Sequence, residues 1–265
     1  KSAWKHDEEF SLRLANFMYG SYTGLSWTMF MLIPSFTAMF GRSALPQIAG
    51  AWTLGNRKEF ERKVTVVLRS NFVIGFPLYL GLSAMSRQIL EFLFSGRQQE
   101  VTVSATSLFI LGLGGVFLTL SSTFISIFQV IGRSDLPVKL MLPGCAVKLI
   151  FNVFTISVPA ININGAAVST VIMYAAVALG GYFALENVTG IDFHIIRRMA
   201  VPLSAGIVCA VVSRIVYGFV RESVNAVTAL FLPIASGGAV YIILLIIFNE
   251  INIKSLLNRQ KRKKF

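Results

Sequence analysis

Long apolar runs alternate with short polar segments along the whole chain. Each run is near the roughly 20 residues that an α-helix needs to cross the hydrocarbon core of a bilayer. Within the runs, apolar and polar residues do not alternate with a period of two, so transmembrane strands are not indicated. The pattern therefore predicts seven membrane-spanning helices, at residues 14–40, 64–85, 104–131, 136–158, 165–185, 199–219 and 227–248.

The longest polar interruption, Gly41–Lys63, separates the first two predicted spans and is rich in basic residues. Because Lys and Arg resist transfer across a membrane, we expect this loop to lie in the cytoplasm. The same orientation makes 1–13 an outer loop or the end of an amphipathic helix, 14–248 a seven-span unit and 249–265 a basic cytoplasmic tail. Most of the 24 Lys and Arg residues then lie inside, and the outer segments hold only Lys1, Lys5, Arg13, Arg87, Arg97 and Arg221.

The composition supports an all-α, polytopic transmembrane helical bundle. Hydrophobic residues make up 55% of the chain and charged residues 14%, whereas a soluble domain carries about 25% charged residues. The net charge of +12 is that of a nucleic-acid-binding protein, but the charge lies in loops and a tail rather than on a soluble face. Contact with anionic membrane lipids is therefore favoured, and no nucleic-acid partner is expected.

The acidic residues and histidines give no pattern typical of an enzyme. All twelve Asp and Glu fall in loops or at the ends of predicted spans, and His6 and His194 lie near opposite faces of the membrane. No carboxylate pair, nucleophile–base pair or metal-ligand cluster is visible. We therefore expect no catalytic residues, no metal and no cofactor. A proton relay through mid-membrane carboxylates is not indicated either.

One lysine lies near the middle of a predicted span. Lys148 is in the fourth span, and Asn152 follows one turn later on the same helix face. An unpaired Lys at this depth costs about 2.5–3.5 kcal/mol, so it should face protein or water. Two interpretations stay open: contact with an anionic headgroup in a central cavity, or hydrogen bonds to carbonyls of a neighbouring helix. Arg69, near the cytoplasmic end of the second span, is a further cavity candidate, although snorkelling to the interface is favoured.

The first predicted span carries a polar stripe at helical spacing. In lipid such a stripe should turn toward a cavity or another helix, and both remain candidates, with close helix packing favoured. The residues of the stripe are Asn16, Tyr19, Thr23 and Ser26.

Several short motifs resemble the second lobe of the multidrug/oligosaccharidyl-lipid/polysaccharide flippase superfamily. The resemblance covers nearly the whole chain and is closest to the polysaccharide-biosynthesis branch, which includes stage V sporulation protein B and the lipid II flippases. Order and spacing make the match more specific than any single motif. The motifs are SALPQIA at 43–49, GNRKEFERK at 55–63, ILEFLF at 89–94, VKLIFN at 147–152 and INGAAVSTVIMY at 163–174.

This resemblance implies a two-lobed fold of fourteen helices around a central cavity. The chain would supply the last seven and would belong to a longer protein, with the N-terminal lobe as its partner. It also implies a function: moving a lipid-linked anionic glycan, an oligosaccharide or peptidoglycan precursor, across the cytoplasmic membrane by alternating access. Lys148 and Asn152 are the residues carried over as cavity candidates.

One departure and two rival functions accompany the resemblance. Lipid II flippases can have a cavity arginine a few residues before the proline of this first span, where the present chain has Met29 in TMFMLIP, 28–34. A drug or metabolite antiporter of the same superfamily is one rival, and it would need a mid-membrane carboxylate. A membrane-embedded glycan-modifying enzyme is the other, and it would need a catalytic His or carboxylate.

Overall fold

The computed structural model describes residues 2–42, 44–156, 158, 161–222 and 224–248. All regular secondary structure among these residues is helical, which confirms the predicted all-α class. The predicted tail at 249–265 lies outside them.

Six helices in the described part of the chain are long and apolar enough to cross a membrane. They begin and end within a few residues of the second to seventh predicted spans, except that α4 begins earlier, inside the basic loop, and α6 begins earlier, at Gln98. This agreement confirms the prediction of a polytopic helical membrane protein. The six are α4 (Arg57–Ala84), α6 (Gln98–Val130), α7 (Asp135–Ile156), α8 (Asn164–Thr189), α9 (Ile195–Val220) and α10 (Ala226–Ile247).

The first predicted span is divided into three helical pieces: α1 (Ser2–Ser21), the π-helical segment η1 (Tyr22–Trp27) and α2 (Thr28–Arg42). Residues 2–13, expected as an outer loop, are part of α1. Hydroxyl groups near the break donate back to backbone carbonyls, Ser21 Oγ to Phe17 at 2.7 Å and Thr28 Oγ1 to the carbonyl five residues earlier at 3.1 Å. Such bonds bend helices, and a π segment is a common site of a kink. The proline at 34 lies inside α2, beyond the break.

The basic loop between the first two spans is itself largely helical. It contains α3 (Leu45–Thr53), and α4 begins only four residues later. The Asn56 side chain caps α4 by accepting a hydrogen bond from the Glu59 N–H at 3.2 Å, which satisfies one free donor of the first turn. Arg62 pairs with the Glu59 carboxylate at 2.6 Å. These contacts fix where the second span starts.

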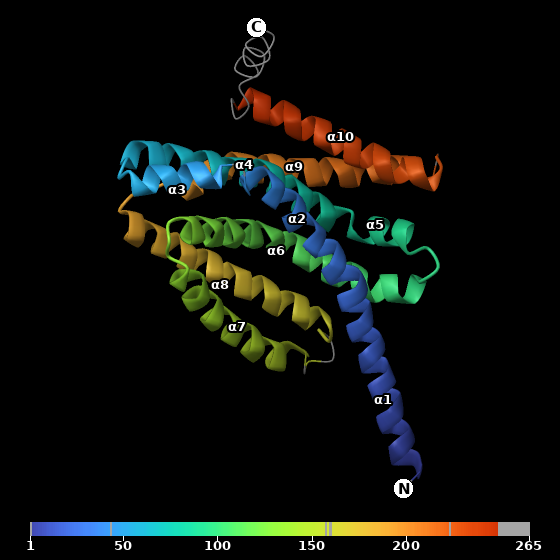
Figure 1. Cartoon of the computed structure of the whole chain (residues 1–265). Helices are drawn as coiled ribbons and strands as arrows, with labels where there is room; N and C mark the ends of the chain where they lie inside the picture. Colours follow the sequence, from blue (N-terminus) through green and yellow to red (C-terminus); the bar gives the residue numbers. More distant parts are fainter. Residues whose placement is uncertain (1, 43, 157, 159–160, 223, 249–265) are drawn as a thin grey trace.

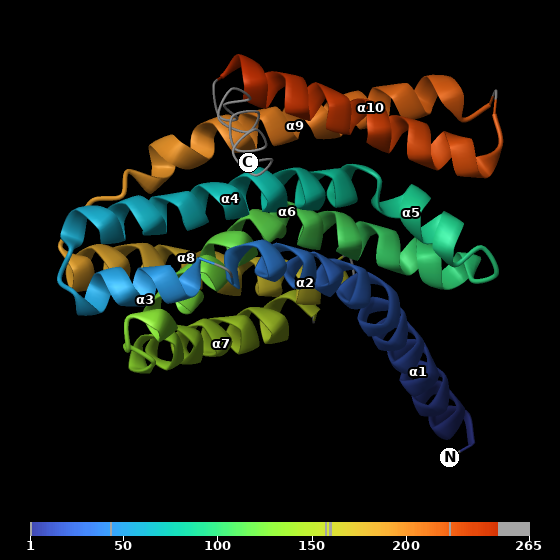
Figure 2. The ribbon, with the colours of Figure 1, turned by 45° about the horizontal axis from the view of Figure 1, so that its top comes forward.

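Helix α6 is the centre of the bundle. It packs against α8 and α4 on opposite sides and also contacts η1 and the short helix α5 (Ser86–Leu93). Figure 2 shows α6 between α4 and the α7–α8 pair. Close approach is possible because α6 carries glycines at its contacts: Gly112 meets the Ser83 backbone, and Gly115 lies under the ring of Tyr79.

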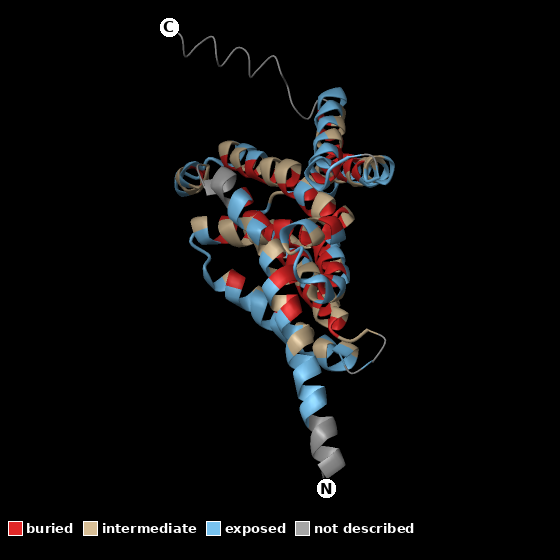
Figure 3. Ribbon diagram, turned by 90° about the vertical axis from the view of Figure 1, so that its right-hand side faces the viewer, coloured by how far each residue is buried: buried red, intermediate tan, exposed pale blue. Residues whose placement is uncertain are grey.

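Buried residues gather along α6 and its neighbours, whereas α1 and the outward faces of α9 and α10 are exposed (Figure 3). Helix α1 leaves the bundle at an angle, and α9 and α10 form a hairpin packed on α4 (Figure 1). Helix α7 buries little of its surface and presents a continuous apolar face. In a membrane protein such a face suits contact with lipid tails or another apolar helix. The exposed side chains on α7 include Leu142, Leu149, Ile150, Val153 and Phe154.

Candidate functional site

Lys148 extends from α7 to the π-helical segment of the first span. Its side chain is half-buried, and Nζ lies 5.4 Å from the centroid of the Trp27 ring. A cation within about 6 Å of an aromatic face is attracted to the ring, by ~0.5–1 kcal/mol at exposed sites and about 2 or more where water is excluded. The ammonium group therefore connects α7 with η1, two parts of the bundle that are distant in sequence.

Asn152, one turn after Lys148, is oriented by a different helix. Its Oδ1 accepts a hydrogen bond from the Ser169 hydroxyl of α8. Both Asn152 and Lys148 are partly exposed, so the same face of α7 presents an amide held by α8 and an ammonium group held by Trp27. Lys148 and Asn152 thus lie one turn apart on α7 and have separate partners, Trp27 of η1 and Ser169 of α8.

A series of hydroxyl and amide hydrogen bonds continues this polar region into the interior. Ser107 of α6 donates to Asn164 Oδ1 of α8 at 2.8 Å. Ser26 of η1 donates to the Ser104 carbonyl at 2.8 Å, and the Ser104 hydroxyl donates to the carbonyl of Ser21 at 2.9 Å. These two bonds join η1 and the end of α1 to α6. Hydrogen bonds of this kind hold transmembrane helices together where apolar packing gives little selectivity.

The polar stripe of the first span is divided by this arrangement. Ser26 is fully buried against α6, so its hydroxyl acts in helix packing. Asn16 and Tyr19 are exposed on α1, and Tyr19 has 63% of its surface free. Thr23 donates to the carbonyl of residue 19 at 2.8 Å. The structure therefore does not bring Asn16, Tyr19 and Thr23 together with Ser26 into one site.

Arg69 lies apart from Lys148. It is on α4, which packs on α6, α9 and α2, whereas α7 packs mainly on α8. Helix α6 stands between these two sides of the bundle (Figures 1 and 2). Nearby on α4, Asn71 donates to Thr123 of α6 at 2.8 Å. Arg69 is therefore on the α4 side of the bundle, apart from the polar region formed by Lys148, Trp27, Asn152 and Ser169.

Sequence reasoning did not assign a role to Trp27 or to the residues that complete the polar region. Asn164 and Ser169 lie in INGAAVSTVIMY, one of the motifs of the resemblance, and that position was an available signal. Ser104 and Ser107 are spaced three residues apart on a long apolar helix, which is typical of polar helix–helix contacts. Trp27 gave no such signal, because its role depends on the approach of α7.

The charged groups near this region are basic rather than acidic. In the described part of the chain, the carboxylates of α4, α7 and α8 lie in the first or last two turns, at Glu59, Glu61, Asp135 and Glu186. Within the same residues no group of His, Cys, Asp and Glu is arranged to hold a metal ion. The chemistry available beside Lys148 is therefore that of a cation, an aromatic face, amides and hydroxyls, which can bind an anion.

Six membrane-length helices in the described part of the chain, with α6 at the centre of the bundle, define an integral membrane protein. The sequence model of the lipid II flippase MurJ family matches residues 11–237. The chain belongs to that family. The departure at Met29 therefore does not exclude the chain from that family.

Individual relatives agree with this assignment. The lipid II flippase MurJ of Bacillus subtilis (strain 168) is 24% identical over 221 residues, which are 80% of this chain and 40% of that protein. An uncharacterised membrane protein of Methanocaldococcus jannaschii is 28% identical over 153 residues, 58% of this chain and 29% of that protein. A solved structure of lipid II flippase MurJ in an inward closed conformation has a TM-score of 0.64 at 17% identity, over 88% of this chain and 46% of that one. The chain thus spans under half the length of these relatives.

Proposed function

We propose that the protein is a flippase that moves a lipid-linked peptidoglycan precursor across the cytoplasmic membrane by alternating access. The described helices form its second, C-terminal lobe, and an N-terminal lobe of the same protein completes the cavity. Membership of the lipid II flippase family favours this function over the antiporter and the glycan-modifying enzyme. The observation that carries the proposal is the half-buried ammonium group of Lys148 over Trp27.

The chemistry of the precursor matches the polar region. A lipid-linked precursor keeps its hydrocarbon tail in the bilayer while its diphosphate and sugars pass through the protein. Removing a diphosphate from water is strongly unfavourable unless cations and hydrogen-bond donors replace the lost hydration. Lys148 supplies a cation, and the Asn152 side-chain NH2 supplies donors, because its Oδ1 is already used by Ser169.

Lys148 also supplies the positive charge that a cavity arginine of the first span can provide in other lipid II flippases. Met29 occupies the place where lipid II flippases can have that arginine, and it lies two residues after Trp27. Because the Lys148 ammonium group reaches Trp27 from α7, positive charge is present at this level of the first span although its own sequence lacks it. In this chain the cation is supplied by a neighbouring helix.

The direct test is complementation by the full-length gene in bacteria depleted of their own lipid II flippase. We expect it to restore growth and to raise the amount of lipid-linked precursor accessible to a reagent on the outer face. Restored accessibility measured within one cell doubling separates flipping from later steps of wall synthesis. Failure of a normally expressed protein to change accessibility would refute the precursor assignment and leave the fold intact.

The proposed orientation places the basic loop and the C-terminal tail in the cytoplasm. Thr53 in that loop and Ser95 between α5 and α6 are both exposed and lie at opposite ends of α4 and α6. With Thr53→Cys and Ser95→Cys, we expect a membrane-impermeant thiol reagent to label only Ser95→Cys in intact cells, above the background of the parent chain. Thr53→Cys should react only after permeabilisation. The reverse pattern would invert the orientation.

A further inference from the structure

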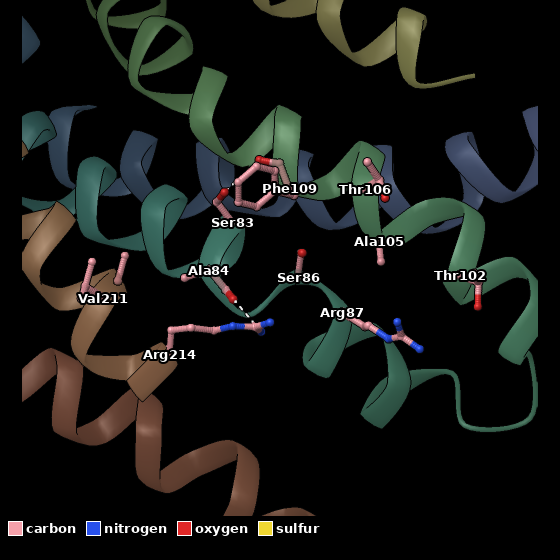
Figure 4. Close-up of a pocket in the computed structure, with 11 residues that line it drawn as sticks. Ser83, Ala84, Ser86, Arg87, Thr102, Ala105, Thr106, Phe109, Val211 and Arg214 are labelled. Carbon is pink, nitrogen blue, oxygen red and sulfur yellow. Dashed lines mark hydrogen bonds between the residues drawn. The ribbon is translucent and has the colours of Figure 1, made fainter. Parts of the chain in front are cut away.

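A pocket with two arginines in its lining lies at the end of the bundle opposite the basic loop, away from Lys148. It is formed by the end of α4, the start of α5, the first turns of α6 and the last third of α9 (Figure 4). Its volume is about 550 Å³, within the range of about 300–1,000 Å³ typical of small-molecule sites. None of the residues of the Lys148 region lines it.

Two arginines from different helices face this pocket. Arg214 of α9 donates to the carbonyl of Ala84, the last residue of α4, through a long contact of 3.4 Å. A guanidinium has five N–H donors, so this contact leaves others for a ligand. Arg87 of α5 uses Nε for the Glu91 carboxylate at 2.7 Å, and Glu91 lines a neighbouring cavity instead. The bond to Glu91 raises the pKa of Arg87, which therefore stays charged.

The remaining lining combines hydroxyls with exposed apolar side chains. Ser86 and Thr102 lie beside the arginines. Phe109 of α6 and Val211 of α9 also line the pocket, with 45% and 51% of their surfaces free. Cations and hydroxyls next to exposed apolar surface fit an amphiphile with a negative headgroup better than a small free ion. On the cytoplasmic side of membranes, basic pockets between transmembrane helices bind lipid headgroups, and the same kinds of group line this pocket at the end of the bundle that the proposed orientation places outside.

We propose that this pocket binds the phosphate of an anionic membrane phospholipid, with its acyl chains along the exposed apolar side chains of α6 and α9. Arg214 and Arg87 contact the phosphate, and the hydroxyls hydrogen-bond the glycerol headgroup. The site is separate from the proposed transport function and does not depend on it. A free inorganic phosphate shares the same phosphate chemistry, so the test must distinguish the two sources.

The test uses the full-length protein in detergent, titrated with phosphatidylglycerol, with bound lipid counted by native mass spectrometry. We expect Arg214→Gln to weaken saturable binding about tenfold, since loss of one charge-assisted contact corresponds to roughly that factor. Arg214→Lys should retain most of the affinity. The matched control is Arg221→Gln, which changes an exposed arginine just beyond α9 that pairs with Glu222 and lines a different cavity.

Two comparisons decide the outcome. Phosphatidylcholine with the same acyl chains should bind at least several-fold more weakly than phosphatidylglycerol, and a tenfold molar excess of inorganic phosphate should leave the lipid bound. Displacement by inorganic phosphate would overturn the lipid assignment in favour of a free anion. Equal phosphatidylglycerol binding by Arg214→Gln and Arg221→Gln would overturn the site itself.

Discussion

Replacement of Lys148 by alanine is expected to lower the rate of precursor flipping at least tenfold, while the amount of protein in the membrane stays near that of the wild type. The expectation rests on the proposed function. Hydrogen bonds to charged groups contribute about 1.5–3 kcal/mol, and 1.4 kcal/mol corresponds to a factor of ten. The loss of the contact with Trp27 is smaller, about 0.5–2 kcal/mol, so folding should be affected less than transport.

The measurement is the rate at which precursor becomes accessible outside the cell, normalised to protein in the membrane. Lys148→Arg should retain a substantial rate because it keeps the charge and can stack on Trp27. Lys139→Ala is the matched control: it lies on the same helix, but its ammonium group is exposed and paired with Asp135 at 2.9 Å. If Lys148→Ala reduced protein amount and rate in equal proportion, the lysine would have a structural role.

The sequence was sufficient to predict α6 to α10 because length and hydropathy alone determine a transmembrane helix. It was insufficient for the first span. The polar residues before position 14 continue the helix as part of α1, and the π segment at Tyr22–Trp27 depends on hydrogen bonds to α6. A proline inside a helix is a common source of bending, yet the π segment lies about two to three turns before the proline at 34. The back-bonds of Ser21 and Thr28 and the hydrogen bond from Ser26 to Ser104 all lie at that break.

The candidate site was predictable only in part, because a sequence shows spacing along one helix but not the contacts between helices. A lysine inside an apolar run is conspicuous, and helical spacing places Asn152 on its face. Their partners, Trp27 and Ser169, come from helices at very different distances along the chain. A single sequence does not show which helices pack against each other. The stripe of the first span shows the same limit, since equal spacing placed Ser26 in the packed interior and Tyr19 on an open surface.

Gly115→Ala is expected to destabilise the lobe by about 1–3 kcal/mol, the usual cost of overpacking a filled core. A Cβ atom at this position would lie 2.1 Å from Cδ1 and Cγ of Tyr79. That ring is 1% exposed and packs at 5.3 Å from the ring of Phe30 in α2. It therefore cannot move aside without displacing α2, so the clash should separate α6 from both α4 and the first span.

Thermal unfolding of the full-length protein in detergent measures this effect, with Gly81→Ala as the control. Gly81 is also inside a transmembrane helix, but a Cβ there would meet nothing within 4 Å. Alanine favours a helix over glycine by up to about 1 kcal/mol, so Gly81→Ala should melt at the wild-type temperature or above it. Glycine-to-alanine substitution should then lower the melting temperature at Gly115 and leave it unchanged or raise it at Gly81. The difference between the two variants reports the contact between α6 and Tyr79 rather than helix propensity. Equal melting temperatures for the two variants would contradict the close packing of α6 on which the whole bundle depends.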